Sequence, residues 1–194
     1  MGSKQAPIDA GRVDNYAREI ATRVDRATPH EYEAALSWYA DAREIATTVA
    51  DALGVSVDAG AGIIAALSPR CPWSRNVALS LDYAHGRDVR TIGAHVAKCD
   101  AIVATDRAGG DPLAQFGATS PKTGAFARNI AGDLDAVTVD VWALRAAGVT
   151  DRDTPTVVQY REISAAYARV ARERGLSPAV AQALAWIVER GGAQ

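Results

Sequence analysis

The sequence is short of cysteine, and this limits the chemistry that it can support. Only two cysteines, Cys71 and Cys99, are present. Two thiols cannot make a disulfide framework, and they fall short of the four thiolates that an iron–sulfur cluster or a structural zinc site needs. The three histidines are scattered, without a second His or Cys at metal-ligand spacing. We therefore expect a reduced, cytoplasmic protein with no metal, no metal cluster and no cofactor.

The chain also lacks a long apolar run and an excess of positive charge. No stretch of about 18 apolar residues appears, and the opening residues lack the apolar core of a signal peptide. We therefore expect neither a membrane-spanning segment nor secretion. The 21 Lys and Arg are offset by 23 Asp and Glu, for a net charge of −2, which excludes a histone-like coat of positive charge. Any contact with nucleic acid must be a local patch.

Apolar residues are plentiful: 48% of the 194 residues are hydrophobic, enough for one compact domain. A small polar residue followed by proline typically begins a helix, and glycine typically ends one. The predicted starts are Thr28-Pro29, Asp111-Pro112, Ser120-Pro121, Thr154-Pro155 and Ser177-Pro178. The predicted ends are Gly54, Gly86, Gly132, Gly148, Gly175 and Gly191. Thr28 and Glu31 are also spaced as a capping box.

Between these marks the apolar residues follow a helical period, which predicts an all-α fold. The first two helices carry Val13 to Val24 and Tyr32 to Leu53. Further helices are expected over about 58–67, 73–85, 93–105, 122–131, 139–147, 156–174 and 178–190. Only residues 136–141 alternate as a strand does, and one short run without a partner cannot build a sheet. We expect a single domain over 1–194, with a helical N-terminal part (10–54), a core (58–148) and C-terminal helices (155–190).

One constellation in this sequence points to chemistry. Lys122 falls in the first turn of a predicted helix, where the helix dipole destabilises its cation and favours a free, nucleophilic amine. Asp140 begins a second helix, and a nearby carboxylate can move the proton of such an amine. The simpler interpretation is that Lys122 is a solvated lysine and Asp140 an N-cap. The phosphate loop, the nucleophile elbow and the zinc-binding HExxH motif are all absent.

The segment resembles the helix-hairpin-helix plus Gly/Pro-Asp (HhH-GPD) superfamily of DNA glycosylases, the endonuclease III type. Lys122-Thr123 matches the end of that family's hairpin and Val139-Asp140 its aspartate, 18 positions after the lysine as in the family. Upstream, residues 62–70 resemble the family's apolar helix with its Leu-Ser turn, residues 73–83 the helix after it, and residues 97–102 the helix before the hairpin. The resemblance covers about residues 58–148 and implies a compact, multi-helix glycosylase fold.

The resemblance implies an enzyme that binds duplex DNA, flips out a damaged or modified base and cleaves its N-glycosidic bond. Lys122 would match the Schiff-base lysine, and Asp140 would stabilise the oxocarbenium charge and assist proton transfer. The walls of the base pocket would include Trp73, Tyr83 and Trp142, although each is also a candidate for ordinary core packing. The residues expected to contact DNA are Arg70, Arg75, Ser120, Thr123, Arg128 and Arg145.

The chain also departs from the family pattern. Ala118 and Ser120 replace two hairpin glycines, Arg70 stands where the family has a gap-filling glutamine, and the cluster cysteines are missing. The Ser68-Pro69 turn, Trp73-x-x-Asn76 and residues 177–186 resemble a divergent branch often seen in bacteriophages, whose setting would be the host cytoplasm. Two alternatives follow: a phage-type enzyme of thymidine hypermodification, which leaves the base attached, and a catalytically silent module that binds DNA or a host protein. The base and the oligomeric state are left open.

Overall fold

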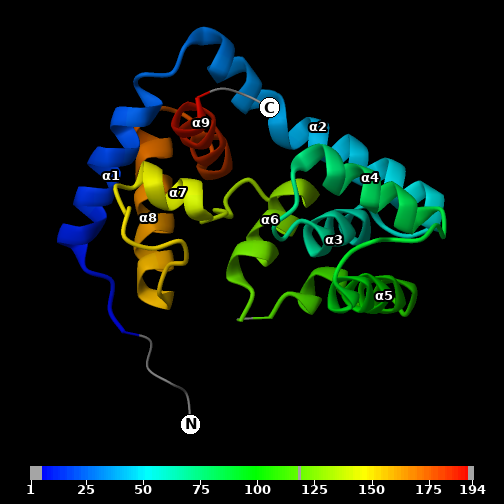
Figure 1. Cartoon of the computed structure of the whole chain (residues 1–194). Coiled ribbons are helices and arrows are strands. Elements are labelled where there is room, and N and C mark those ends of the chain that lie inside the picture. Colours follow the sequence, from blue (N-terminus) through cyan, green and yellow to red (C-terminus); the bar gives the residue numbers. More distant parts are fainter. Residues whose placement is uncertain (1–5, 118, 192–194) are drawn as a thin grey trace. The chain divides into compact units, whose positions relative to one another are not determined.

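The protein is described by a computed structural model that covers residues 6–117 and 119–191. Figure 1 shows its helices in chain order, and the described residues contain no strand. The helices are α1 (Ala10–Val24), α2 (Pro29–Leu53), α3 (Val57–Leu67), α4 (Trp73–Ala84), α5 (Gly93–Arg107), the 3₁₀ helix η1 (Pro112–Gln115), α6 (Pro121–Ala131), α7 (Val141–Ala146), α8 (Val157–Glu173) and α9 (Pro178–Arg190). The predicted all-α fold class is confirmed.

Most predicted helix ends are confirmed by their capping geometry. All six glycines predicted to end helices have positive φ, a conformation that glycine adopts without a steric penalty. In the capping box before α2, the backbone N–H of Glu31 donates to Thr28 Oγ1, and that of Thr28 donates to Glu31 Oε2.

Three local predictions differ from the structure. The Thr154-Pro155 start is wrong, because Thr156 caps α8 in a capping box with Gln159. Residues 112–115 form a 3₁₀ helix that apolar periodicity did not reveal, since it is only four residues long. The alternation over residues 136–141 reflects an extended segment that buries Val137 and Val139 and leads into α7.

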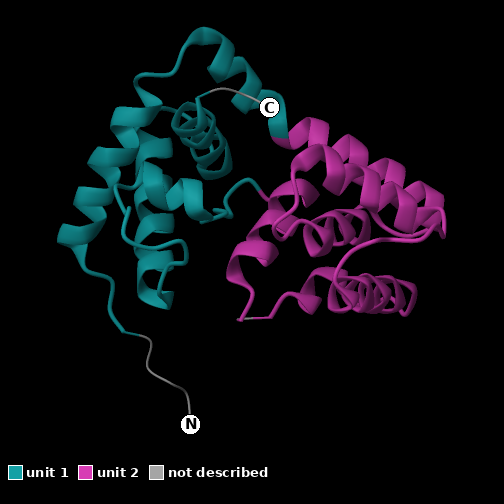
Figure 2. Cartoon of the chain, viewed as in Figure 1, with its two compact units in different colours: residues 1–38, 134–194 teal, residues 39–133 magenta. Residues whose placement is uncertain are grey.

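The chain divides into two compact units, coloured in Figure 2: residues 1–38 with 134–194 form unit 1, and residues 39–133 form unit 2. These boundaries differ from the three segments expected from the sequence. The expected core (58–148) contributes residues to both units, and the N-terminal and C-terminal helices share unit 1. Capping signals mark where helices begin and end, but they carry no information about which helices pack together.

Unit 2 is built around α3, which packs against α4, α5, α6 and η1. Every residue of α3 from Ala59 to Leu67 is buried. Small residues allow this close packing: a Cβ added to Gly60 would lie 2.2 Å from the carbonyl oxygen of Ala46 in α2. Apolar side chains from α4 and α5, among them Leu79 and Ile102, complete the core.

Unit 1 packs α8 against α1 and α9. Tyr167 and Leu184 are fully buried in its core. A buried ion pair ties α1 to α8: Arg12 donates to both carboxylate oxygens of Glu162, whose side chain is 0% exposed. The backbone N–H of Asp9 donates to the same carboxylate, so its charge is well compensated.

Candidate functional site

The hairpin before α6 is a tight turn that brings η1 against the start of the helix. The backbone N–H of Ser120 donates to the carbonyl of Gly117 at 2.9 Å, and Ser120 adopts φ −127°, which any residue can adopt. The Ser120 side chain makes no capping hydrogen bond to α6. Ala118, which replaces one family glycine, lies outside the described residues. The serine at the second glycine position is therefore compatible with the turn as it stands.

Two close contacts hold this hairpin in place. Lys98 of α5 donates to the carbonyl of Gln115 at 2.9 Å and lies 5.4 Å from the ring centroid of Phe116. A Cβ added to Gly124 would lie only 3.0 Å from the Cβ of Phe116, so glycine allows α6 to approach the hairpin closely. The hairpin is thus fixed from both sides within unit 2.

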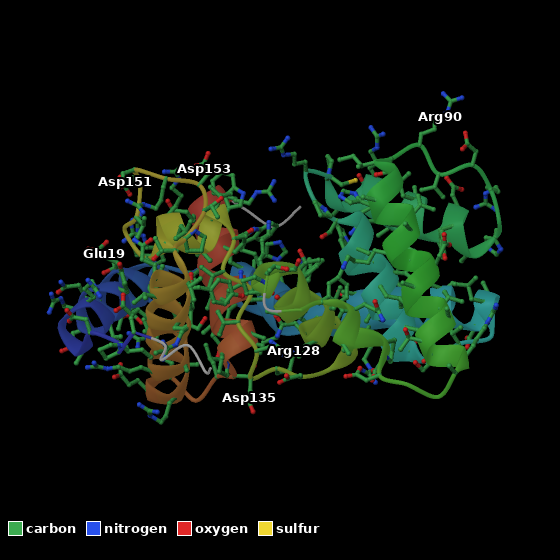
Figure 3. The ribbon with its side chains drawn as sticks, turned by 90° about the horizontal axis from the view of Figure 1, so that it is seen from below. Glu19, Arg90, Arg128, Asp135, Asp151 and Asp153 are labelled. Atoms are coloured by element: carbon green, nitrogen blue, oxygen red, sulfur yellow. The ribbon has the colours of Figure 1, made fainter. Side chains whose placement is uncertain are left out.

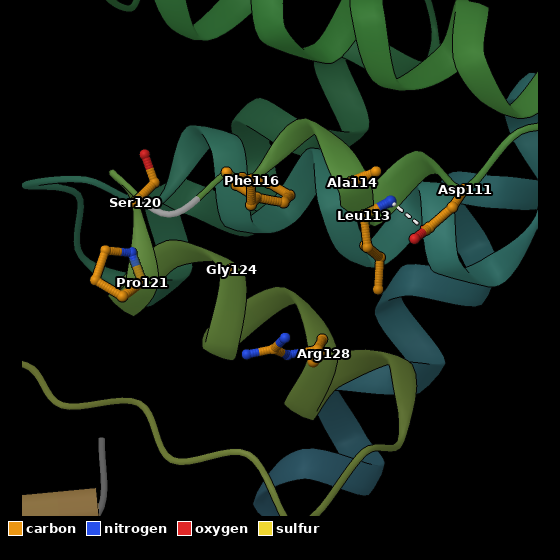
Figure 4. A pocket seen from close by; sticks show the side chains of 9 residues that line it. Asp111, Leu113, Ala114, Phe116, Ser120, Pro121, Gly124 and Arg128 are labelled. Carbon is orange, nitrogen blue, oxygen red and sulfur yellow. Dashed lines mark hydrogen bonds between the residues drawn. The ribbon is translucent and has the colours of Figure 1, made fainter. Parts of the chain in front are cut away.

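A concave pocket of about 380 Å³ lies between η1, the hairpin and α6 (Figure 4). It is lined by Asp111, Leu113, Ala114, Phe116, Gly117, Ser120, Pro121, Gly124 and Arg128. Asp111 Oδ1 accepts from the backbone N–H of Leu113 and so caps η1. Arg128 lies 3.9 Å from Asp133, and both side chains are about half exposed. The pocket therefore offers a mobile guanidinium beside the first turn of a helix, a pairing that suits a phosphate group.

Lys122 is the second residue of α6 and is exposed. Its ammonium group makes no ion pair within the described part of the chain. Thr123, beside it, is half-buried. Phe126 follows Lys122 by one helical turn, so the two side chains share one face of α6. An exposed primary amine at the start of a buried helix is accessible to a substrate.

Asp140 belongs to unit 1, where it caps α7: its Oδ1 accepts from the backbone N–H of Ala143 at 2.8 Å. The N-cap interpretation of Asp140 is thus confirmed. The residue is half-buried, and the preceding Val139 is buried. Burial and, next, the charge of Asp140 raise the pKa of the fully buried Tyr167 well above its ordinary value. The carboxylate thus acts in a low-dielectric environment, where its charge has a strong effect.

The predicted pocket residues Trp73 and Tyr83 both lie on α4 in unit 2. The Trp73 ring meets Phe126 edge-on, with centroids 6.4 Å apart and planes at 75°. Tyr83 donates its hydroxyl hydrogen to Asp100 Oδ1 at 2.8 Å and packs against the core. Burial and this hydrogen bond raise the pKa of Tyr83. Trp73 therefore lies next to the Lys122 face of α6, whereas Tyr83 ties α4 to α5.

Trp142 lies in unit 1, two residues after Asp140, in an aromatic cluster that sequence reasoning missed. The guanidinium of Arg190 stands 5.5 Å from the Trp142 ring centroid and 4.4 Å from that of Trp186. Trp186 in turn lies 6.4 Å from Trp38. Arg190 and Trp186 are one turn apart on α9, but no sequence signal links them to Trp142.

The predicted DNA-contacting arginines differ in how they are engaged. Arg70 is exposed and has φ +58°, which is uncommon for a residue other than glycine. Arg75 is exposed and makes a long hydrogen bond of 3.4 Å to the carbonyl of Arg90, whose own side chain reaches into solvent (Figure 3). Arg145 donates to Thr150 and to Asp153, labelled in the same view, and so fastens the loop after α7.

Two searches of the coordinates concern metals and membranes. Within residues 6–117 and 119–191, no three His, Cys, Asp or Glu side chains gather as a metal site. No single helix in this range is long and apolar enough to cross a membrane, although α2 and α3, bent by 108°, pass that test jointly by length and composition alone.

The fold and site define an all-helical protein with an exposed lysine beside a hairpin pocket and an aspartate that caps a short helix. The chain belongs to the DUF7178 family, a family of unknown function, whose sequence profile matches residues 3–193. No curated protein matched the chain, and no solved structure did.

Proposed function

We propose that this protein acts on DNA bases in the manner of an HhH-GPD glycosylase: it flips out a damaged or modified base and cleaves the N-glycosidic bond with a lysine/aspartate pair. The observation that carries the proposal is the exposed Lys122 in the first turn of α6, directly after the hairpin, with Asp140 18 positions later at the start of α7. Glycosidic bond cleavage needs a nucleophile and a carboxylate, and these two residues supply them.

Lys122 supplies the nucleophile. Its neutral amine attacks C1′ of the sugar, the bond from C1′ to the base breaks, and the bonding electrons leave with the base. The attacking nitrogen loses a proton and the departing base gains one. Opening of the sugar ring then leaves a Schiff base, which water hydrolyses to release the enzyme. The exposure of Lys122 supports this role, because the amine must reach a nucleotide that has left the duplex.

Asp140 supplies the negative charge. Its carboxylate stabilises the oxocarbenium character that develops at C1′ and passes the proton from the lysine nitrogen to the leaving base. Capping of α7 through Oδ1 fixes the orientation of the carboxylate. Because a carboxylate accepts about four hydrogen bonds, one capping bond leaves capacity for catalysis.

Contacts to the DNA backbone fall to the hairpin pocket and to exposed arginines of unit 2. Arg128 lines the pocket and is paired with Asp133 only at 3.9 Å, so a phosphate can compete for it. Arg70 and Arg75 are exposed near the start of α4. The positive φ of Arg70 is a strained backbone state of the kind that clusters at functional sites.

Sodium-borohydride trapping tests the proposal. Borohydride reduces the Schiff base to a stable amine, so the wild type is expected to form a covalent adduct on duplexes that carry an abasic site, uracil, an oxidised base or 5-hydroxymethyluracil. Lys122→Arg is the matched control, because it keeps the positive charge but cannot form a Schiff base. It should bind the duplex and give no adduct. An adduct that persists in Lys122→Arg would refute the assigned nucleophile.

Asp140→Asn separates chemistry from structure at the second residue. The asparagine oxygen still accepts from Ala143, so the cap is kept and the charge is lost. We expect base release to slow by roughly a hundredfold or more, with little change in Tm. An equal rate in Asp140→Asn would contradict the role of the carboxylate.

The geometry of Ser120 favours retaining the alternatives. Its N–H already donates to Gly117, so it is not available to a phosphate. This weakens duplex binding through the hairpin backbone and favours a phage-type enzyme of base modification or a silent binding module. Mass spectrometry of the nucleosides after incubation separates these readings. A released base supports cleavage, a changed base that stays on its sugar supports modification, and bound but unchanged DNA supports a silent module.

A further inference from the structure

Asn76 of α4 is a buried polar residue whose side-chain oxygen has no partner. Three buried side-chain atoms within the described residues lack a hydrogen-bond partner: Asn76 Oδ1, His95 Nδ1 and Ser164 Oγ. Of these residues only Asn76 is buried as a whole, at 1% exposure. Buried polar atoms in folded proteins almost always have a partner, because an unpaired one costs free energy without gain. An orphan acceptor at such a site therefore points to a ligand that supplies the missing donor.

The position of Asn76 indicates which ligand this is. Asn76 follows Trp73 by three positions, so both lie on one face of α4. The Trp73 ring packs edge-on against Phe126 of α6, and Phe126 lies one turn after Lys122 on the same face of that helix. Asn76 thus belongs to the side of α4 that faces the Lys122 side of α6. All four residues lie within unit 2.

We propose that Asn76 is the residue that reads the edge of the base acted on at Lys122. Its Oδ1 accepts an N–H of the base, and its amide N–H groups donate to a neighbouring acceptor. The chemical class is a nucleobase with an N–H donor directly beside an acceptor. Two kinds of base carry that edge: the lactams, such as uracil and thymine derivatives, and the amidines, cytosine and adenine. This inference rests on the proposed function, because it assumes that the ligand at Lys122 is a nucleotide.

The unpaired oxygen makes a prediction that a structural asparagine does not. Asn76→Leu removes a buried polar group that has no partner and keeps a similar volume. Its Tm should therefore equal or exceed that of the wild type. Ser80→Ala is the matched control: Ser80 is fully buried one turn further along α4, and its hydroxyl donates to the carbonyl of Asn76 at 2.8 Å. Loss of that satisfied bond should lower Tm by about 2–4 °C.

Binding is measured on the full chain with four nucleosides, 2′-deoxyuridine, thymidine, deoxycytidine and deoxyadenosine, and with the duplexes of the trapping assay. The wild type is expected to bind at least one nucleoside, and Asn76→Leu to bind it roughly tenfold more weakly or worse. Ser80→Ala should bind as the wild type does. A preference for deoxyuridine or thymidine identifies the lactam edge, and a preference for deoxycytidine or deoxyadenosine identifies the amidine edge.

Three results would overturn the inference: Asn76→Leu lowers Tm as much as Ser80→Ala does, Asn76→Leu binds every probe as tightly as the wild type, or the wild type binds none of the probes. Failure of the proposed function gives a different pattern. If nucleoside binding is lost in Asn76→Leu while the wild type forms no borohydride adduct and releases no base, Asn76 reads a base and the lyase chemistry is absent.

Discussion

The closest approach of two helices in unit 2 predicts a sharp difference between two neighbouring glycines. Gly60 and Gly62 are both buried in α3, two residues apart. A Cβ on Gly60 would lie 2.2 Å from the backbone oxygen of Ala46, whereas ordinary contact starts at 3.4 Å. A Cβ on Gly62 would meet methyl groups of Ile102 at 3.3 Å. Alanine thus requires α2 and α3 to separate by about 1.2 Å at Gly60, but only a small side-chain shift at Gly62.

The expected magnitudes follow from these distances. Overpacking of a tight core costs about 1–3 kcal/mol, and a clash with backbone lies at the upper end of this range, because a backbone cannot rotate away. Alanine in place of glycine within a helix returns about 0.5–1 kcal/mol. Gly60→Ala should therefore destabilise the protein by about 2 kcal/mol, or lower Tm by about 4–8 °C. Gly62→Ala should leave Tm unchanged or raise it by about 2–4 °C.

Thermal unfolding followed by circular dichroism at 222 nm measures both variants against the wild type. Gly93→Ala is a second control, since a Cβ at this exposed first residue of α5 meets nothing within 4 Å. The reasoning is refuted if Gly60→Ala unfolds at the wild-type temperature or above it. It is also refuted if Gly62→Ala loses as much stability as Gly60→Ala, because the close approach to Ala46 would then not be the cause.

Three further predictions concern buried polar groups and thiols. Hydrogen bonds from Arg12 lower the pKa of Glu162 below its ordinary value of 4.5, so the ion pair stabilises the fold above that pH and the stabilisation is lost as the pH falls below it. Glu162→Gln should therefore lower Tm by about 2–4 °C at pH 7 and by less at pH 3, and a constant difference across this range would contradict the linkage. Burial raises the pKa of Cys99 to about 12 and also that of Cys71, so iodoacetamide at pH 7.5 should label the half-buried Cys71 slowly and Cys99 only after unfolding; rapid labelling of Cys99 would show that it is not buried. Tyr83→Phe should lower Tm by about 2–4 °C through loss of the bond to Asp100, and an unchanged Tm would exclude that bond as a tie between α4 and α5.

Much of the secondary structure was predictable because its signals are local. The Thr28 capping box, proline after Ser120 and Ser177, and glycine at the helix ends each act within one turn of the chain. The Thr154-Pro155 error has the same origin. Two candidate caps stood two residues apart, and Gln159, three positions after Thr156, decided between them. Such a competition is settled by the reciprocal hydrogen bond, which the pattern of Pro and Gly does not include.

The candidate site was predictable only in part, because its contacts join residues that are far apart in the sequence. The sequence singled out Lys122, Asp140 and Trp73, but not the edge-on contact of Trp73 with Phe126. It did not link Arg190 to Trp142 either, since the stacking of a guanidinium on a ring has no sequence period. Asn76 was noticed in a motif, but its importance rests on burial and an unpaired oxygen, which only coordinates provide.

Asp140 shows why the structural and the catalytic interpretation of one residue need not compete. A catalytic carboxylate must be held in one orientation, and capping a helix is a way to hold it: Oδ1 is fixed by the N–H of Ala143. The same bond makes Asp140 part of the fold, so replacement by alanine would remove cap and charge together and could not tell them apart. Asparagine keeps the acceptor and removes only the charge. The comparison of Asp140→Asn with Asp140→Ala therefore assigns a loss of stability to the cap and a loss of rate to the carboxylate, each from its own measurement.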